Sequence, residues 1–396
     1  MESHAVTYEF IQLIIRKLAR SRRCGHCRRR ICPHMLSLFL LFTEELEKRR
    51  RKLYMNANGD EELFHEYTRL TFSEFESLHN RLKDRLQHLR SHRYPIDTIH
   101  RLAICLRYLG HGRSFHALGH EFRLGRSTVT AIVYEVCRAI LAEFRHEALP
   151  LPTPETWKES ADGFQNLWNY PRGIAAIDGK HFRCIAPINS GSSHFNYKGF
   201  FSIVLLLVVD SNYKILLLDC GGKGRISDSG LFRTSPIRRS LENAKASFPP
   251  SAPLGRHGTV EYHVLADGGF PQTSWMQRPF QQQEACRDAK KTHFNECFSS
   301  ARRVVESVFG IICSRFRVFQ APLQGCPENM KLIIITACVL HNLLAKSLTR
   351  DELSSRYPHN VLDENEVARP SRAQTQDDAR AQRRLVEYFA ERDGYE

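Results

Sequence analysis

The 396-residue chain lacks a long hydrophobic run, an internal repeat and a dense cysteine framework. A membrane-spanning helix needs about 20 mostly apolar residues, and the apolar stretches Leu36–Phe42 and Phe201–Val209 are much shorter. The 12 cysteines are scattered through apolar segments of a long chain. That pattern favours reduced thiols over a secreted disulfide scaffold. We therefore expect neither a membrane anchor nor a disulfide framework.

Acidic residues are fewer than basic residues. Asp and Glu total 43 against 57 Lys and Arg, which gives a formal net charge of +14. The apolar share of 42% and the charged share of 25% are globular proportions, so wholesale disorder and fibrous repeats are excluded. The basic excess favours a polyanionic partner, with nucleic acid first and an anionic membrane surface second.

Composition and periodicity divide the chain into four parts. Residues 1–52 form a basic arm and residues 53–147 a helical region. Residues 148–346 read as an α/β domain, and residues 347–396 as a polar tail that we expect to be disordered. A proline cluster at 147–157 marks the boundary before the α/β domain.

The basic arm leaves two questions open. Arg16–Arg30 contains eight Lys and Arg residues and no acidic residue. It could be a nuclear localisation signal, a phosphate-binding segment or solvated charge. Cys24, Cys27, Cys32 and His34 could bind Zn²⁺, but their spacing lacks the second half of an ordinary zinc motif.

Three short helical patterns follow one another between about residues 99 and 141. Glycines end the first, Ser114 can cap the second, and a Leu-Gly turn precedes the third, which Ser127 can cap. This spacing predicts a helix-turn-helix, and the alternative is an ordinary three-helix bundle. The side chains expected to contact DNA are Arg113, His116, Arg123, Arg126 and Thr130.

Beyond the proline cluster the hydrophobic period becomes strand-like. Strands are predicted at Gly173–Cys184, Phe201–Val209, Tyr213–Asp219 and His263–Ala266, with any fifth strand within 277–294. Helices are predicted at 227–243, 298–316 and 330–345, with a further short one at 385–391. The fold class expected from this order is α/β, a mixed sheet flanked by helices, preceded by an all-α region.

Three acidic residues stand out by position. Asp178 lies in the first predicted strand and Asp267 directly follows the fourth, each before a glycine, while Glu306 lies in an apolar helix, where an unpaired carboxylate is costly. Mg²⁺ prefers oxygen ligands, commonly one or two carboxylates. Two such ions can promote phosphodiester cleavage, and the glycines would let a phosphate approach closely. The pattern predicts a metal site, with three unrelated acidic residues as the alternative.

Five segments, in order, resemble the PIF/Harbinger transposases, and especially the Harbinger transposase-derived nucleases of the DDE superfamily. They are Ile177–His181, Asn196–Ser202, Asp267–Pro271, Ala301–Gly310 and Val339–Leu344. The resemblance runs from about residue 95 to 346 and implies a ribonuclease-H-like fold. It also implies that Asp178, Asp267 and Glu306 are the catalytic metal ligands. Lys180 and Gly268 stand where the family usually has Thr and Ser.

The resemblance also implies an activity and its partners. A divalent cation, Mg²⁺ or alternatively Mn²⁺, would support DNA cleavage without a covalent protein intermediate. DNA and a Myb/SANT-like DNA-binding protein would be partners, and the nucleus the location, with the cytoplasm and a homo-oligomer left open. The alternatives are a non-catalytic DNA-binding protein that retains the fold, and an RNA nuclease.

Further residues are candidates for supporting roles. Lys198, Arg302 and Arg303 are expected to contact DNA. Asp228 and His341 lie in segments that resemble family motifs and are retained as additional site candidates. For Asp228 a helix cap is the competing interpretation, and for His341 a satisfied core histidine.

Overall fold

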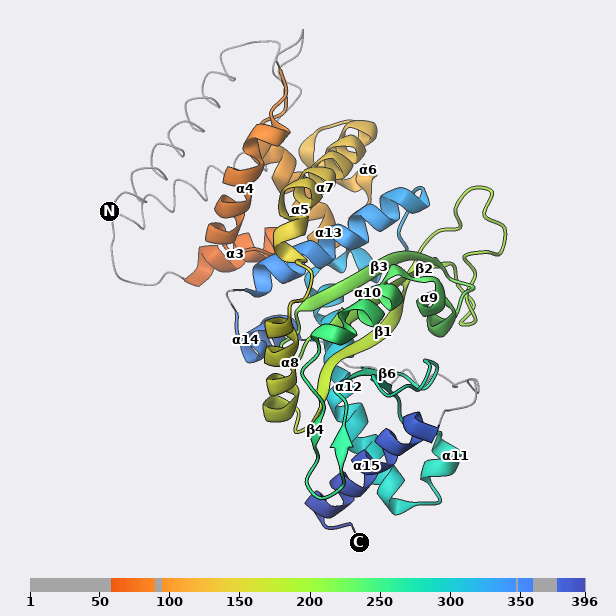
Figure 1. Ribbon diagram of the computed structural model, residues 1–396. Coiled ribbons are helices and arrows are strands. Elements are labelled where there is room, and N and C mark those ends of the chain that lie inside the picture. Colours follow the sequence, from red (N-terminus) through yellow and green to blue (C-terminus); the bar gives the residue numbers. More distant parts are fainter. Residues whose placement is uncertain (1–57, 90–94, 347, 359–375, 396) are drawn as a thin grey trace, which may run out of the picture. The chain divides into compact units, whose positions relative to one another are not determined.

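The computed structural model describes residues 58–89, 95–346, 348–358 and 376–395 (Figure 1). These residues divide into two compact units, one ending at Ile140 and the other beginning at Leu141. The predictions made for the basic arm, including the zinc question, fall outside the described residues.

The first unit is helical, as predicted. Asp97 and Ser114 cap the helices α5 and α6, and Gly112 ends α5 with a left-handed backbone. The third predicted helix begins one residue before Ser127. The described helices are α3 (Asn58–Thr68), α4 (Phe72–Leu86), α5 (Thr98–His111), α6 (Phe115–Phe122) and α7 (Arg126–Ala148), the last of which continues into the second unit. A role for α5–α7 in DNA binding stays a prediction.

A five-stranded mixed sheet organises the second unit, in the order β3-β2-β1-β6-β7. β2 pairs antiparallel with both β1 and β3, whereas β1, β6 and β7 run parallel. The strands are β1 (Gly173–Arg183), β2 (Ser202–Val209), β3 (Ile215–Lys223), β6 (His263–Ala266) and β7 (Met276–Gln277). The α/β prediction is confirmed, and all eight residues of β2 are buried because helices cover both faces of the sheet.

One face of the sheet packs against α8 (Pro154–Leu167), α9 (Asp228–Thr234) and α10 (Pro236–Ala244). Ile177 of β1 belongs to this core, so alternation along the strand turns Asp178 to the opposite face. That face is covered by α12 (Ala289–Arg315) and α13 (Pro327–Ala345). The predicted single helix over 227–243 is wrong, because Pro236 starts a second helix after Ser235.

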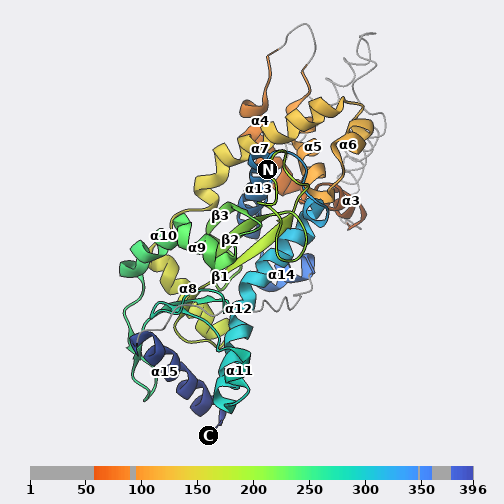
Figure 2. The ribbon, with the colours of Figure 1, turned by 90° about the vertical axis from the view of Figure 1, so that its right-hand side faces the viewer.

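The predicted disorder of the tail is wrong for α14 (Arg350–Arg356) and for much of α15 (Gln376–Asp393), while the short helix predicted at 385–391 is confirmed as part of α15. α15 packs along α12 (Figure 2), and both Leu385 and Phe389 are fully buried. The apolar side chains of α15 recur at helical spacing within a very polar sequence. Their packing partners lie on α12, far away in the sequence.

Shorter elements complete the second unit. These are η2 (Lys245–Ser247), β4 (Ala252–Pro253), β5 (Thr259–Val260), α11 (Gln282–Ala285) and η3 (Arg317–Gln320). β4 and β5 form a separate antiparallel pair.

Among the described residues one helix, α13, is long and apolar enough to cross a membrane by length and composition alone. However, 61% of its apolar window is buried inside the protein. Near its end, the Asn342 amide accepts the Ile215 N–H at 2.9 Å and donates to the Ile215 carbonyl at 2.8 Å. These are the contacts of a core helix that packs on the sheet.

Candidate active site

Two of the predicted acidic residues are neighbours because their strands are parallel. Ile177 of β1 pairs with Ala266 of β6, and Asp178 and Asp267 each follow directly. Since Ile177 and Ala266 both face the α8–α10 core, Asp178 and Asp267 both lie on the α12 side. The sheet register therefore brings the two carboxylates side by side.

The third acidic residue reaches the same place from α12. Glu306 lies one turn after Arg302, and the two side chains are hydrogen-bonded. A second nitrogen of the Arg302 guanidinium lies 3.5 Å from Asp178 Oδ2. One guanidinium therefore joins a carboxylate of the sheet to a carboxylate of the covering helix.

Asp267 and Glu306 both lie near enough to Asp178 to affect its ionisation. Burial raises the pKa of Asp178 to about 7, with Asp267 and Glu306 adding to the shift and Arg302 opposing it. Burial alone would lower the pKa of Arg302, but Asp178, Glu306 and Asp267 together raise it. Negative charge is thus concentrated at one point, and a cationic side chain balances part of it.

The three carboxylates converge on Arg302, but their oxygens do not all lie within 4.8 Å of one another in the part of the chain that the structure describes, so a bound cation would have to draw them together. The side chains of Asp178, Glu306 and Arg302 remain about one-fifth exposed, so solvent reaches them. Three carboxylates supply the oxygen donors that Mg²⁺ and Mn²⁺ prefer. Burial raises the pKa of Asp178 although Arg302 lies close by, so ionising this carboxylate is costly without a further cation. Asp178, Asp267 and Glu306 are the residues that would hold the ion.

Gly179 and Lys180, which follow Asp178, have neighbours that the sequence does not predict. A Cβ at Gly179 would lie 2.3 Å from the Asp228 carboxyl, so this glycine makes room for Asp228 rather than for a phosphate. Asp228 is buried, is the first residue of α9, and packs on the opposite face of the sheet from Asp178. Lys180 lies beside α12, with its ammonium 5.7 Å from the Phe309 ring centre.

The other predicted site residues are spread more widely. Arg302 belongs to the acidic cluster, whereas Lys198 and Arg303 are exposed, and the DNA contacts expected of all three stay predictions. His341 is buried, and its ring forms a 2.8 Å hydrogen bond with the Tyr213 carbonyl. Burial lowers its pKa to about 4, as expected for a neutral core histidine. Of the helix-turn-helix candidates, four are exposed and Thr130 bonds the backbone of its own helix.

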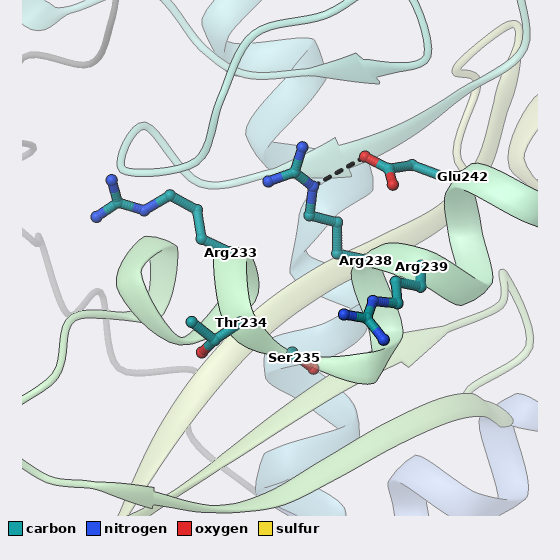
Figure 3. A pocket seen from close by; sticks show the side chains of 6 residues that line it. All are labelled: Arg233, Thr234, Ser235, Arg238, Arg239 and Glu242. Atoms are coloured by element: carbon teal, nitrogen blue, oxygen red, sulfur yellow. Dashed lines mark hydrogen bonds and ion pairs between the residues drawn. The ribbon is translucent and has the colours of Figure 1, made fainter.

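A basic pocket was missed by the sequence analysis. Arg233, Arg238 and Arg239 surround a cavity of about 410 Å³ where α9 ends and α10 begins (Figure 3). Glu242 pairs with Arg238 at 2.8 Å, which leaves a surplus of positive charge. Ser235 caps α10 at this point, so the positive end of the helix dipole adds to the pocket. In the sequence, the three arginines lie within seven residues on either side of Pro236. That spacing could have indicated a basic pocket at the start of a helix.

The mixed sheet, with two acidic residues on neighbouring strands and a third on the covering helix, is consistent with a DDE nuclease fold. Residues 177–342 match the family described as DDE superfamily endonuclease. This stretch is therefore similar to the DDE superfamily endonucleases, which confirms the resemblance drawn from the five sequence segments.

Two relatives illustrate the similarity. "Protein ALP1-like" of Arabidopsis thaliana is 26% identical over 254 residues, or 63% of this chain and 61% of the relative. "Putative nuclease HARBI1" of Bos taurus is 26% identical over 230 residues, or 57% of this chain and 61% of the relative. The chain thus spans less than two thirds of their length. The comparison with solved structures gives no match.

Proposed function

We propose that this protein is a metal-dependent DNA endonuclease of the Harbinger transposase-derived type, with a ribonuclease-H-like catalytic domain. The observation that carries the proposal is the convergence of Asp178, Asp267 and Glu306 around the guanidinium of Arg302. The strand order β3-β2-β1-β6-β7, with only β2 reversed, supports the ribonuclease-H-like assignment. The nuclease wording in a relative's name agrees with it.

In this proposal each residue has a defined task. Asp178, Asp267 and Glu306 bind the divalent cations, with Mg²⁺ as the first choice and Mn²⁺ as the second. When bound, such ions activate the attacking water and stabilise the leaving oxygen of a phosphodiester. Arg302 holds Asp178 and Glu306 in place and limits their repulsion. No Ser, Tyr or Cys is assigned as a nucleophile, so the protein forms no covalent intermediate.

The basic surfaces would bring DNA to this acidic centre. Arg233, Arg238 and Arg239 lie on the two helices that follow Asp228, and we assign them to backbone phosphates (Figure 3). We assign Arg113, His116, Arg123, Arg126 and Thr130 to a second DNA contact. A nuclear location and a Myb/SANT-like partner complete the proposal.

The main rival is a DNA-binding protein that keeps the fold without catalysis. The experiment that separates the two uses the purified full chain, labelled duplex DNA, and Mg²⁺, Mn²⁺ or EDTA. We expect cleavage with either metal and none with EDTA, while DNA binding persists in EDTA. DNA binding without cleavage in any metal would establish the rival. Cleavage of RNA in preference to DNA would assign the site to an RNA nuclease.

A further inference from the structure

A second cluster of metal-binding side chains lies away from the acidic centre, where α12 meets α15. His293 and Cys297 are one turn apart on the same face of α12, and Asp393 ends α15. One donor atom from each lies within 4.8 Å of the others. At a rise of about 1.5 Å per residue, Cys297 is roughly 14 Å along α12 from Glu306, so the two clusters are separate sites.

We propose that His293, Cys297 and Asp393 bind a zinc ion that fastens the C-terminal helix α15 to α12. His293 Nε2 lies 3.5 Å from Cys297 Sγ and 2.7 Å from Asp393 Oδ2, and the sulfur lies 4.0 Å from that oxygen. A tetrahedral zinc with ordinary bond lengths separates its ligand atoms by about 3.3–3.7 Å. Binding therefore requires only that His293 and Asp393 move apart by less than about 1 Å.

The surrounding groups hold these side chains in the orientation that a metal needs. The Tyr395 ring stacks on the His293 ring at a centroid distance of 4.0 Å. The other ring nitrogen of His293, Nδ1, is buried without a hydrogen-bond partner among the described residues, and the nearest carboxylate oxygen, that of Glu296, lies 3.7 Å away. Arg392 donates from Nε to Asp393 Oδ1 at 2.7 Å, which turns Oδ2 toward His293.

The donor set selects the kind of ion. A thiolate and an imidazole favour zinc and similar transition metals, whereas Mg²⁺ favours oxygen ligands alone. Three protein ligands leave a fourth position for water. Arg392 Nη2 lies 2.6 Å from Asp393 Oδ2 and 3.8 Å from Cys297 Sγ. Without metal, this guanidinium is therefore the cation that balances the charge of Asp393. The ion would share Asp393 with Arg392.

The site gives the tail a physical reason to fold. α15 has a strongly polar sequence, and the sequence alone predicted disorder for most of it. A metal bond between Asp393 and two residues of α12 would add to the burial of Leu385 and Phe389.

Cobalt provides the most direct test, because a cobalt–thiolate bond produces a near-ultraviolet charge-transfer band. The full chain, purified under a non-thiol reductant, would be titrated with Co²⁺ and then with Zn²⁺. We expect one tightly bound ion at this site, a charge-transfer band that Zn²⁺ abolishes, and loss of both in Cys297→Ser and His293→Gln. The exposed Cys286 supplies the matched control, and Cys286→Ser should keep the band.

The basic arm carries other cysteines, so a triple variant of Cys24, Cys27 and Cys32 to Ser is needed in parallel. Retention of the band in that variant, with its loss in Cys297→Ser, supports the site. Asp393→Asn, which keeps the side-chain size, should weaken zinc binding by at least tenfold. A cobalt–thiolate band that survives Cys297→Ser in the background of the triple variant, or no zinc binding by the folded wild type, would overturn the inference and leave an Arg392–Asp393–His293 ion-pair network.

Discussion

Asp178 Oδ2 lies 3.5 Å from the guanidinium of Arg302, which also hydrogen-bonds Glu306 one turn further along α12. The acidic centre therefore has an internal counter-charge before any metal binds. A bound divalent cation would take over part of this task, so Arg302 and the metal should partly replace each other in stabilising the site.

Removing this counter-charge should make folding depend on metal. Arg302→Met leaves three neighbouring carboxylates without their cation, and we expect a loss of about 1–3 kcal/mol in EDTA, because the ion pairs are only one-fifth exposed. Mg²⁺ or Mn²⁺ should raise the melting temperature more in this variant than in the wild type. Thermal unfolding with and without metal measures both effects. Arg303→Met, at the exposed neighbouring arginine, is the control. If metal raised the melting temperature equally in Arg302→Met and Arg303→Met, Arg302 would not be the counter-charge of the acidic centre.

The raised pKa of Asp178 predicts a pH-dependent stability difference. The folded protein keeps a proton on Asp178 up to about pH 7, whereas the unfolded chain loses it near the usual value of 3.8. The wild type should therefore lose stability relative to Asp178→Asn as pH rises between these limits. The change should be about 1–3 kcal/mol. Urea unfolding in EDTA at pH 5 and pH 8 tests it, and a pH-independent difference would contradict a raised pKa.

Gly179 should tolerate no side chain while Asp228 is present. A Cβ at Gly179 would meet the Asp228 carboxyl at 2.3 Å, and burial leaves that carboxyl little room to move. We expect Gly179→Ala to cost about 1–3 kcal/mol. In the double variant with Asp228→Ala the cost should be clearly smaller, as a double-mutant cycle would show. Simple additivity of the two substitutions would mean that the contact carries no strain.

The arginine pocket should contribute to DNA affinity through phosphate contacts alone. Arg233→Gln with Arg239→Gln should weaken binding without sequence preference and reduce the salt dependence by about two phosphate contacts. The cleavage rate of bound DNA should change much less, since the acidic centre is untouched. Binding measured over a range of salt concentrations tests this. Arg287→Gln, an exposed arginine elsewhere in the second unit, is the control. An unchanged salt slope in the double variant would exclude the pocket as a DNA contact.

Much of the fold could be predicted because strands and helices leave different hydrophobic periods. The prediction of His263–Ala266 as a strand is confirmed without a shift, and that of β1 is one residue too long. Once β1 and β6 are parallel neighbours, the meeting of Asp178 and Asp267 follows. The break at Pro236 could also have been found from the sequence, because proline is unfavourable inside a helix.

Other features depend on long-range packing that no local pattern reveals. Helical spacing pairs Arg302 with Glu306, but only the rotation of α12 over the sheet brings that guanidinium to Asp178. Likewise, α15 is stabilised by side chains of α12 that lie about 90 residues earlier. The sequence predicts that Gly179 makes room for a phosphate, because no local pattern shows that Asp228 packs against this glycine.

The most direct test of the central claim is DNA cleavage by the wild type and by Asp178→Asn, Asp267→Asn and Glu306→Gln, measured with Mg²⁺ and with Mn²⁺. Asp162→Asn, an exposed carboxylate on α8, is the matched control. We predict that each substitution in the acidic centre reduces cleavage by at least a hundredfold while folding and DNA binding persist, and that the control cleaves like the wild type. Equal cleavage by all five proteins would contradict the assignment of these three carboxylates as the catalytic centre.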